Sequence, residues 1–155
     1  MDKVPIVTLI FYSIPESFLI LSFGLTIQKK KLSFSPILLA TLISVAASYC
    51  ARLLPLPYGI HTFLGVLTVF LMFLFILRLD PKQSLVSSIV SIGVLVALES
   101  VILSYIQFQL GLGLQDVMAL SPWQKTIIGW PHLAVWAGLT TYLYHKHKFN
   151  QAISQ

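Results

Sequence analysis

Five long apolar runs constrain the fold of this 155-residue chain more than any other feature. A helix needs about 20 apolar residues to cross the hydrocarbon layer of a bilayer. Only 10% of the residues are charged and the mean hydropathy is +0.87, so polar residues are too few to cover this much apolar surface. We therefore expect an all-α polytopic membrane protein with a single transmembrane domain. The five expected spans are residues 4–27, 36–54, 59–77, 85–109 and 126–144.

The basic residues predict how the spans are oriented, because cytoplasmic loops carry an excess of Lys and Arg. Most of them fall on one side of the expected spans: Lys29, Lys30, Lys31, Arg78, Lys82, Lys146 and Lys148. We expect that side to be cytoplasmic, with the N-terminus outside, the C-terminus inside and the chain in the plasma membrane. A short interfacial helix is expected near residues 114–122, with Ser121 and Pro122 as the cap and first residue of the last helix.

Charge and motif content argue against several classes of function. Because the basic residues flank apolar runs, we expect them to contact anionic lipid headgroups and not nucleic acid. The sequence has no Gly-rich phosphate loop, nucleophile elbow, HExxH motif or cysteine pair, so we expect no cofactor, no metal site and no soluble-type catalysis. Cys50 is the single cysteine. His145 and His147 are two residues apart, so on a helix they diverge and cannot chelate one ion.

Two glutamates fall inside apolar runs, where an ionisable side chain is costly and usually faces a partner or water. Glu16 lies roughly 18 Å, and Glu99 roughly 15 Å, from the outer end of its expected span at the helical rise per residue. Arg52 and His61 flank the connection between the second and third spans. We expect these four residues to form a polar cavity that binds a ligand or signal in the outer half. The alternative is that Arg52 only anchors its helix and the others are hydrogen-bonded locally.

Two proline sites accompany this polar cluster. Pro15 directly precedes Glu16 and removes a backbone hydrogen bond, so we expect a kink that opens a polar pocket beside the carboxylate. The stretch GWPH, residues 129–132, predicts irregular backbone near the outer end of the last span. This irregularity makes His132 a fifth candidate residue, at the edge of the same cavity.

The stretch LPLPYGIH, residues 54–61, is expected to form the outer turn between the second and third spans. Pro55 and Pro57 keep the backbone extended and Gly59 lets it turn, so about four residues suffice for the connection.

The same stretch carries a resemblance to a known family. Arg52 is followed, after Leu53, by LPLPYGIHT, a leucine-rich span, an inner turn, a span containing Glu99, an outer loop near GL, and a last span entered through WPHL. This order, over residues 10–145, resembles the N-terminal membrane-spanning sensory region of Gram-positive sensor histidine kinases with a GHKL-type ATPase domain. Glu16, Glu99 and His132 fall at polar positions that correspond. In that family an ATP-binding domain follows the last span, whereas this sequence stops eleven residues after Tyr144, so we expect no kinase activity from it.

The resemblance implies a bacterial sensory module that acts on a separate partner. The candidate partners are the lipid bilayer, a separate histidine kinase or another membrane protein, and further copies of the chain. The main alternative is a small transport component that binds a substrate or cation, because transporters also use buried acids and broken helices. An intramembrane peptidase with Glu16 and Glu99 as paired acids is a third and weaker alternative.

Overall fold

The computed structural model describes residues 8–53, 58–111 and 121–153, and the regular elements of these residues are all helices, as predicted. Two of them, η1 and η2, are single π-helical turns that continue directly into or out of an α-helix. The elements are η1 (Leu9–Ser13), α2 (Ile14–Ile27), α3 (Phe34–Leu53), α4 (Tyr58–Leu71), η2 (Met72–Ile76), α5 (Pro81–Leu110) and α7 (Pro122–Ile153). Pro55, Pro57 and residues 112–120, where most of the interfacial helix was expected, lie outside the described residues.

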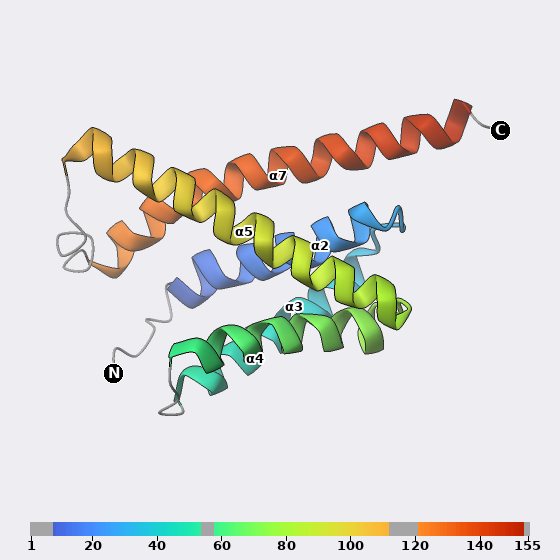
Figure 1. Ribbon diagram of the computed structural model, residues 1–155, viewed down its shortest axis with the longest axis horizontal. Helices are drawn as coiled ribbons and strands as arrows, with labels where there is room; N and C mark the ends of the chain where they lie inside the picture. Colours follow the sequence, from blue (N-terminus) through green and yellow to red (C-terminus); the bar gives the residue numbers. More distant parts are fainter. Residues whose placement is uncertain (1–7, 54–57, 112–120, 154–155) are drawn as a thin grey trace.

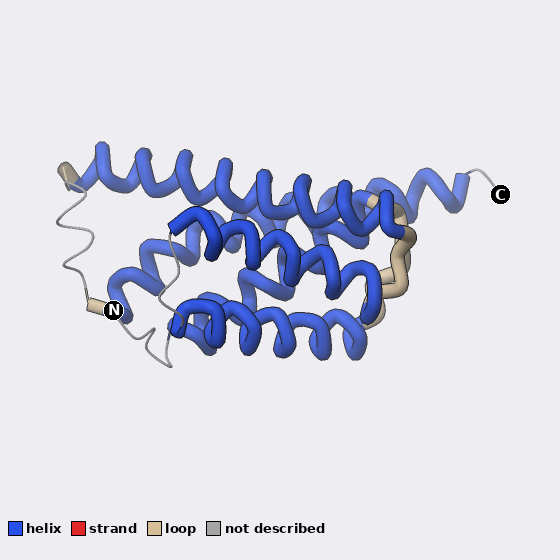
Figure 2. Tube along the Cα trace, turned by 60° about the horizontal axis from the view of Figure 1, so that its bottom comes forward, coloured by secondary structure: helices blue, strands red, loops and turns tan. Residues whose placement is uncertain are grey.

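Helix α2 forms the centre of the bundle and packs against α3, α5 and α7 (Figure 1). Helix α4 lies on α3 and α5, on the opposite side of the bundle from α7. Successive helices run in opposite directions, so the two described connections between helices gather at one end (Figure 2). The C-terminal part of α7 projects beyond the other helices at that same end.

The last two helices are longer than the expected spans. Helix α5 begins at Pro81 and not at residue 85, because Asp80 has extended backbone and Pro81 is pre-organised for a first helical turn. It ends at Gly111, whose φ of 61° gives the left-handed conformation that glycine adopts without strain. Helix α7 begins as predicted: Gln124 N–H donates to Ser121 Oγ, and Ser121 N–H donates to Gln124 Oε1, which together form a capping box.

Three of the helices are long and apolar enough to cross a membrane: Leu9–Ile27, Phe34–Ala51 and Pro81–Gln109. Thr62–Ile76 is a shorter apolar helix. Among the described residues, length and hydropathy together are therefore satisfied by three of the five expected spans. Helix α7 is long enough, but its middle carries Trp, Pro, His, Gly and Thr, which lower its hydropathy.

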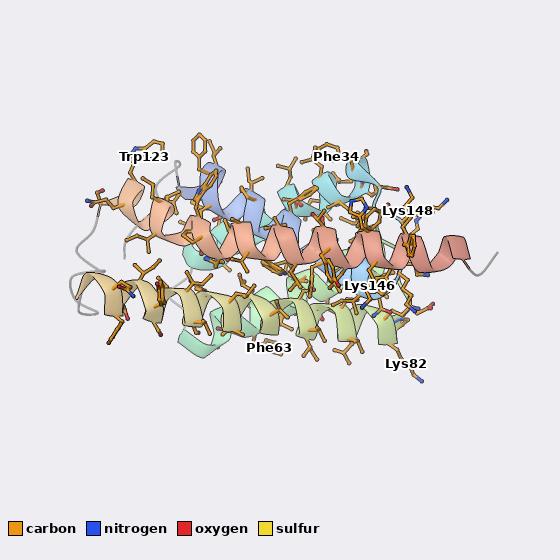
Figure 3. The ribbon with its side chains drawn as sticks, turned by 90° about the horizontal axis from the view of Figure 1, so that it is seen from above. Phe34, Phe63, Lys82, Trp123, Lys146 and Lys148 are labelled. Atoms are coloured by element: carbon orange, nitrogen blue, oxygen red, sulfur yellow. The ribbon has the colours of Figure 1, made fainter. Side chains whose placement is uncertain are left out.

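The distribution of side chains between surface and interior also fits a membrane protein. Large apolar side chains such as Phe34, Phe63 and Trp123 are exposed on the outside of the bundle (Figure 3). Many buried side chains carry hydroxyl groups, among them four serines of α5. Several of the buried hydroxyls donate to a carbonyl of their own helix, as Thr41 does to Ile37 at 2.8 Å. An apolar surface over a hydroxyl-rich interior is the arrangement that a hydrocarbon solvent favours.

Candidate functional site

The first helix, which consists of η1 and α2, changes from π-helical to α-helical winding immediately before Glu16. In a regular α-helix the ring of Pro15 would collide with the carbonyl group four residues earlier. Here the preceding turn is π-helical, and the Ile14 N–H donates to the Leu9 carbonyl. The kink expected at Pro15 thus takes the form of a π-turn, and Glu16 follows it in the first turn of α2. Such turns are found frequently at functional sites.

Glu16 lines a cavity of about 460 Å³ between α2, α3, α4 and α5. Apolar side chains such as Ile20, Val69 and Leu95 form much of the wall. The remaining wall is rich in hydroxyl groups, which come from Ser17, Ser44, Ser48, Thr62 and Thr68. Glu16 also lines a second cavity of about 30 Å³ between the first helix and α3. A cavity of about 460 Å³, with apolar walls and a few polar groups, is typical of a small-molecule site.

Two residues show that the large cavity has room and unused hydrogen-bonding capacity. Ser44 is only 5% exposed, and its Oγ has no hydrogen-bond partner within the described part of the chain. Leaving a buried hydroxyl unpaired costs free energy, so Ser44 is a point in the cavity lining whose hydrogen-bonding capacity is unused. Gly65 also lines the cavity, and a Cβ added there would have no side-chain or distant backbone atom within 4 Å.

A second polar cluster forms where the first helix, α5 and α7 meet. The Tyr12 hydroxyl lies 3.4 Å from Nε2 of His132, and the two rings meet edge to face with centroids 5.7 Å apart. His132 is 1% exposed, and Glu99 lies close enough to interact electrostatically with its ring. Gly129 makes the approach possible, because a Cβ at that position would collide with the Tyr12 ring. The cluster therefore connects three helices.

Among the expected residues whose side chains are described, the structure places Glu16 at one site and Glu99 with His132 at an adjacent one. Glu99 and His132 are not among the residues that line the Glu16 cavity, so the expected common cavity is corrected for these three residues. Glu99 lies one turn beyond Leu95 on α5, about 6 Å further along the helix axis. Because Leu95 lines the cavity, one face of α5 serves both sites.

The expected irregular backbone at residues 129–132 is also corrected. These residues belong to the continuous helix α7, with Pro131 in its interior. Trp130 and Pro131 lie on the exposed side of the helix, whereas Gly129 and His132 face the bundle. A proline inside a membrane helix is tolerated where its surroundings satisfy the freed backbone groups.

The structure places the remaining candidates at the end of the bundle opposite the described loops. Arg52 lies in the last turn of α3, and His61 lies in the first turns of α4. Their side chains lie outside the described part of the structure. Gly59 belongs to the first turn of α4, which begins at Tyr58, so it is helical and its expected role in the turn is corrected.

Sequence reasoning missed the hydroxyl-bearing residues of the cavity and Tyr12. Ser44 and Ser48 are four residues apart on α3, and Thr62 and Thr68 are both on α4. A spacing of three or four residues places side chains on one helix face. This spacing inside an apolar run is the signal that would have found Ser44 and Ser48, whereas Thr62 and Thr68 are six residues apart and have no such signal.

No group of three or more His, Cys, Asp or Glu residues that could hold a metal ion occurs among the described residues. Comparison of the chain with protein-family models, with curated proteins and with solved structures finds no match.

Proposed function

We propose that the protein is an integral membrane sensory module whose signal binds in the Glu16 cavity. The observation that carries the proposal is the cavity itself: about 460 Å³, with a carboxylate at a π-turn and a buried hydroxyl that has no partner among the described residues. Apolar walls with a few hydrogen-bonding groups suit a small amphipathic molecule.

The proposal includes five membrane spans, with the N-terminus outside. Three helices have the required length and apolar composition, and α4 with η2 and α7 run alongside them through the bundle. Lys82, Lys146 and Lys148 lie at one end (Figure 3), together with the basic loops that follow α2 and η2. By the positive-inside rule that end is cytoplasmic, and the Glu16 cavity then lies in the outer half.

The polar cluster next to the cavity supplies a route for the signal. A ligand changes a protein only if it binds one arrangement of the helices better than another. Glu16 and Tyr12 lie on consecutive turns of the first helix, and Tyr12 contacts His132 of α7. A shift of the first helix would therefore move α7, whose C-terminal end projects from the bundle. That projecting end is where a separate histidine kinase, another membrane partner or a second copy would bind.

Photoaffinity labelling of the chain in lipid vesicles tests the proposed site. The probes are two diazirine-bearing aliphatic molecules of the same length, one an alcohol and one an amine. Labelled residues are mapped by mass spectrometry, and we expect them in the cavity. Gly65→Leu places a side chain in the open space and should reduce labelling about tenfold, which corresponds to roughly 1.4 kcal/mol. Gly93→Leu is the matched control, because a Cβ on Gly93 also meets open space but Gly93 is not among the residues that line the cavity.

Two results separate the alternatives. Equal labelling of the Gly65→Leu and Gly93→Leu proteins would contradict the site. Uptake of the amine probe into vesicles, abolished by Glu16→Gln, would contradict a purely sensory role and favour a transport component. For the sensory role we expect no uptake, and a change in the distance between spin labels at positions 75 and 149 when the probe binds. The spin-label measurement uses Cys50→Ser as the background.

A further inference from the structure

The two loops at the projecting end of α7 close with the same unusual backbone conformation. Lys29 and Arg78 each have a φ of 53°, the left-handed conformation that glycine adopts most readily. After Lys29, the Lys30 N–H donates to the Leu25 carbonyl at 3.0 Å. After Arg78, the Leu79 N–H donates to the Phe73 carbonyl at 3.0 Å. These bonds close the helix ends as glycine usually does, so two long basic residues occupy glycine-type positions at a cost in free energy.

A cavity of about 490 Å³ lies between these two loops. Among the described residues, its lining includes three basic ones, Lys30, Lys31 and Arg78, and no acidic one. Ser33, the residue before α3, also lines it, so the positive end of a helix dipole faces the same space. A cluster of cations at a helix N-terminus attracts an anion, and guanidinium and ammonium groups form strong hydrogen bonds with phosphate oxygens.

Apolar residues also line the cavity between the two loops. Leu25 and Leu79 are buried core residues that line it, together with Ile76 and Leu77. A free phosphate ion has no apolar group that could contact these side chains, whereas a phospholipid presents its phosphate and its first acyl carbons together. Basic pockets between membrane helices on the cytoplasmic side bind lipid headgroups in this way.

We propose that the cavity between Lys30, Lys31 and Arg78 binds the phosphate of an anionic phospholipid. The bound lipid holds the end of α2 and the end of η2 together. Its site is separate from the Glu16 cavity, since the two cavities share no lining residue. This inference stands whether or not the Glu16 cavity binds a signal.

The two loops supply a matched pair of variants. Arg78→Gly and Lys29→Gly each remove one positive charge, and each puts glycine where φ is 53°. Only Arg78 lines the cavity. The purified full chain in a neutral detergent is titrated with phosphatidylglycerol, with phosphatidylcholine as the reference, and bound lipids are measured by native mass spectrometry. We expect Arg78→Gly to weaken phosphatidylglycerol binding about tenfold. Lys29→Gly should change it by no more than about twofold.

Three results would overturn the proposal. Equal losses of phosphatidylglycerol binding in Arg78→Gly and Lys29→Gly would mean that the positive charge of this end attracts the lipid without a specific site. Binding of phosphatidylcholine as tight as that of phosphatidylglycerol would mean that the charge is not recognised. Inorganic phosphate that binds as tightly as the lipid, and is lost in Arg78→Gly, would overturn the assignment to a lipid. Should Arg78→Gly fail to fold, Lys31→Gln with Lys82→Gln as its control makes the same comparison, because Lys82 does not line the cavity.

Discussion

Small residues have opposite effects on packing in the two halves of the bundle. In the half nearer the basic loops, Gly24 of α2 lies directly under the Phe73 ring, and Ser87 of α5 donates to the Gly24 carbonyl at 3.2 Å. In the other half, Gly65 of α4 faces the open space of the Glu16 cavity. A small residue lets helices approach closely only when a neighbouring side chain fills the space. Where none does, the same residue type leaves a cavity.

Removal of the Phe73 ring should have the largest effect on stability, because it would open a cavity in the half of the bundle nearer the basic loops. Phe73 is fully buried, whereas Phe75, two residues away, is 71% exposed. We expect Phe73→Ala to lower the free energy of unfolding by about 3–5 kcal/mol. Phe75→Ala should lower it by less than about 1 kcal/mol. Unfolding by SDS titration in mixed micelles measures both, and similar losses would show that the Phe73 ring does not fill the space between helices in this half.

Addition of a methyl group should distinguish the two glycines by a smaller amount. A Cβ on Gly24 would collide with the Phe73 ring, so we expect Gly24→Ala to destabilise the protein by about 1–3 kcal/mol. Gly65→Ala meets open space and should change the free energy of unfolding by no more than about 0.5 kcal/mol. The double variant Gly24→Ala, Phe73→Leu should recover part of the loss. If Gly24→Ala is as stable as the wild type, the contact between Gly24 and Phe73 is not required for the packing of this half of the bundle.

The smallest expected effect concerns a hydrogen bond between helices. Ser87 Oγ donates across to α2, whereas Ser88 Oγ donates at 2.9 Å to Leu85 of its own helix. Both serines are fully buried. Ser87→Ala should cost about 0.6 kcal/mol, the average for polar contacts between membrane helices. Ser88→Ala removes no contact between helices, so a cost equal to that of Ser87→Ala would count against a specific role for the Ser87 bond.

Much of the fold was predictable, because the apolar runs set the number and approximate place of the helices. Each expected span corresponds to a helix or to an α-helix joined to a π-turn. The starts of α5 and α7 were encoded locally, by Asp80 with Pro81 and by Ser121 with Pro122. The π-turn at Leu9–Ser13 is a local response to Pro15.

The site was predictable only in part. A glutamate inside an apolar run identified Glu16, and the structure places it at a cavity. The same reasoning identified Glu99 but joined it to Glu16, because the distance from the end of a span does not show which helices pack beside each residue. Tyr12 and the cavity hydroxyls were missed, since each is an ordinary residue of a membrane helix until its neighbours are known.

Composition and short-range order along the chain make the protein helical, apolar on its outside and basic at one end. The packing of the bundle established which helix faces meet. It separated the Glu16 cavity from the cluster of Tyr12, Glu99 and His132, and it placed Phe73 over Gly24 but nothing over Gly65. The physical reason is that packing depends on the rotation of each helix about its axis. Between apolar helices in an apolar solvent, that rotation follows from contacts between particular side chains and not from hydrophobicity.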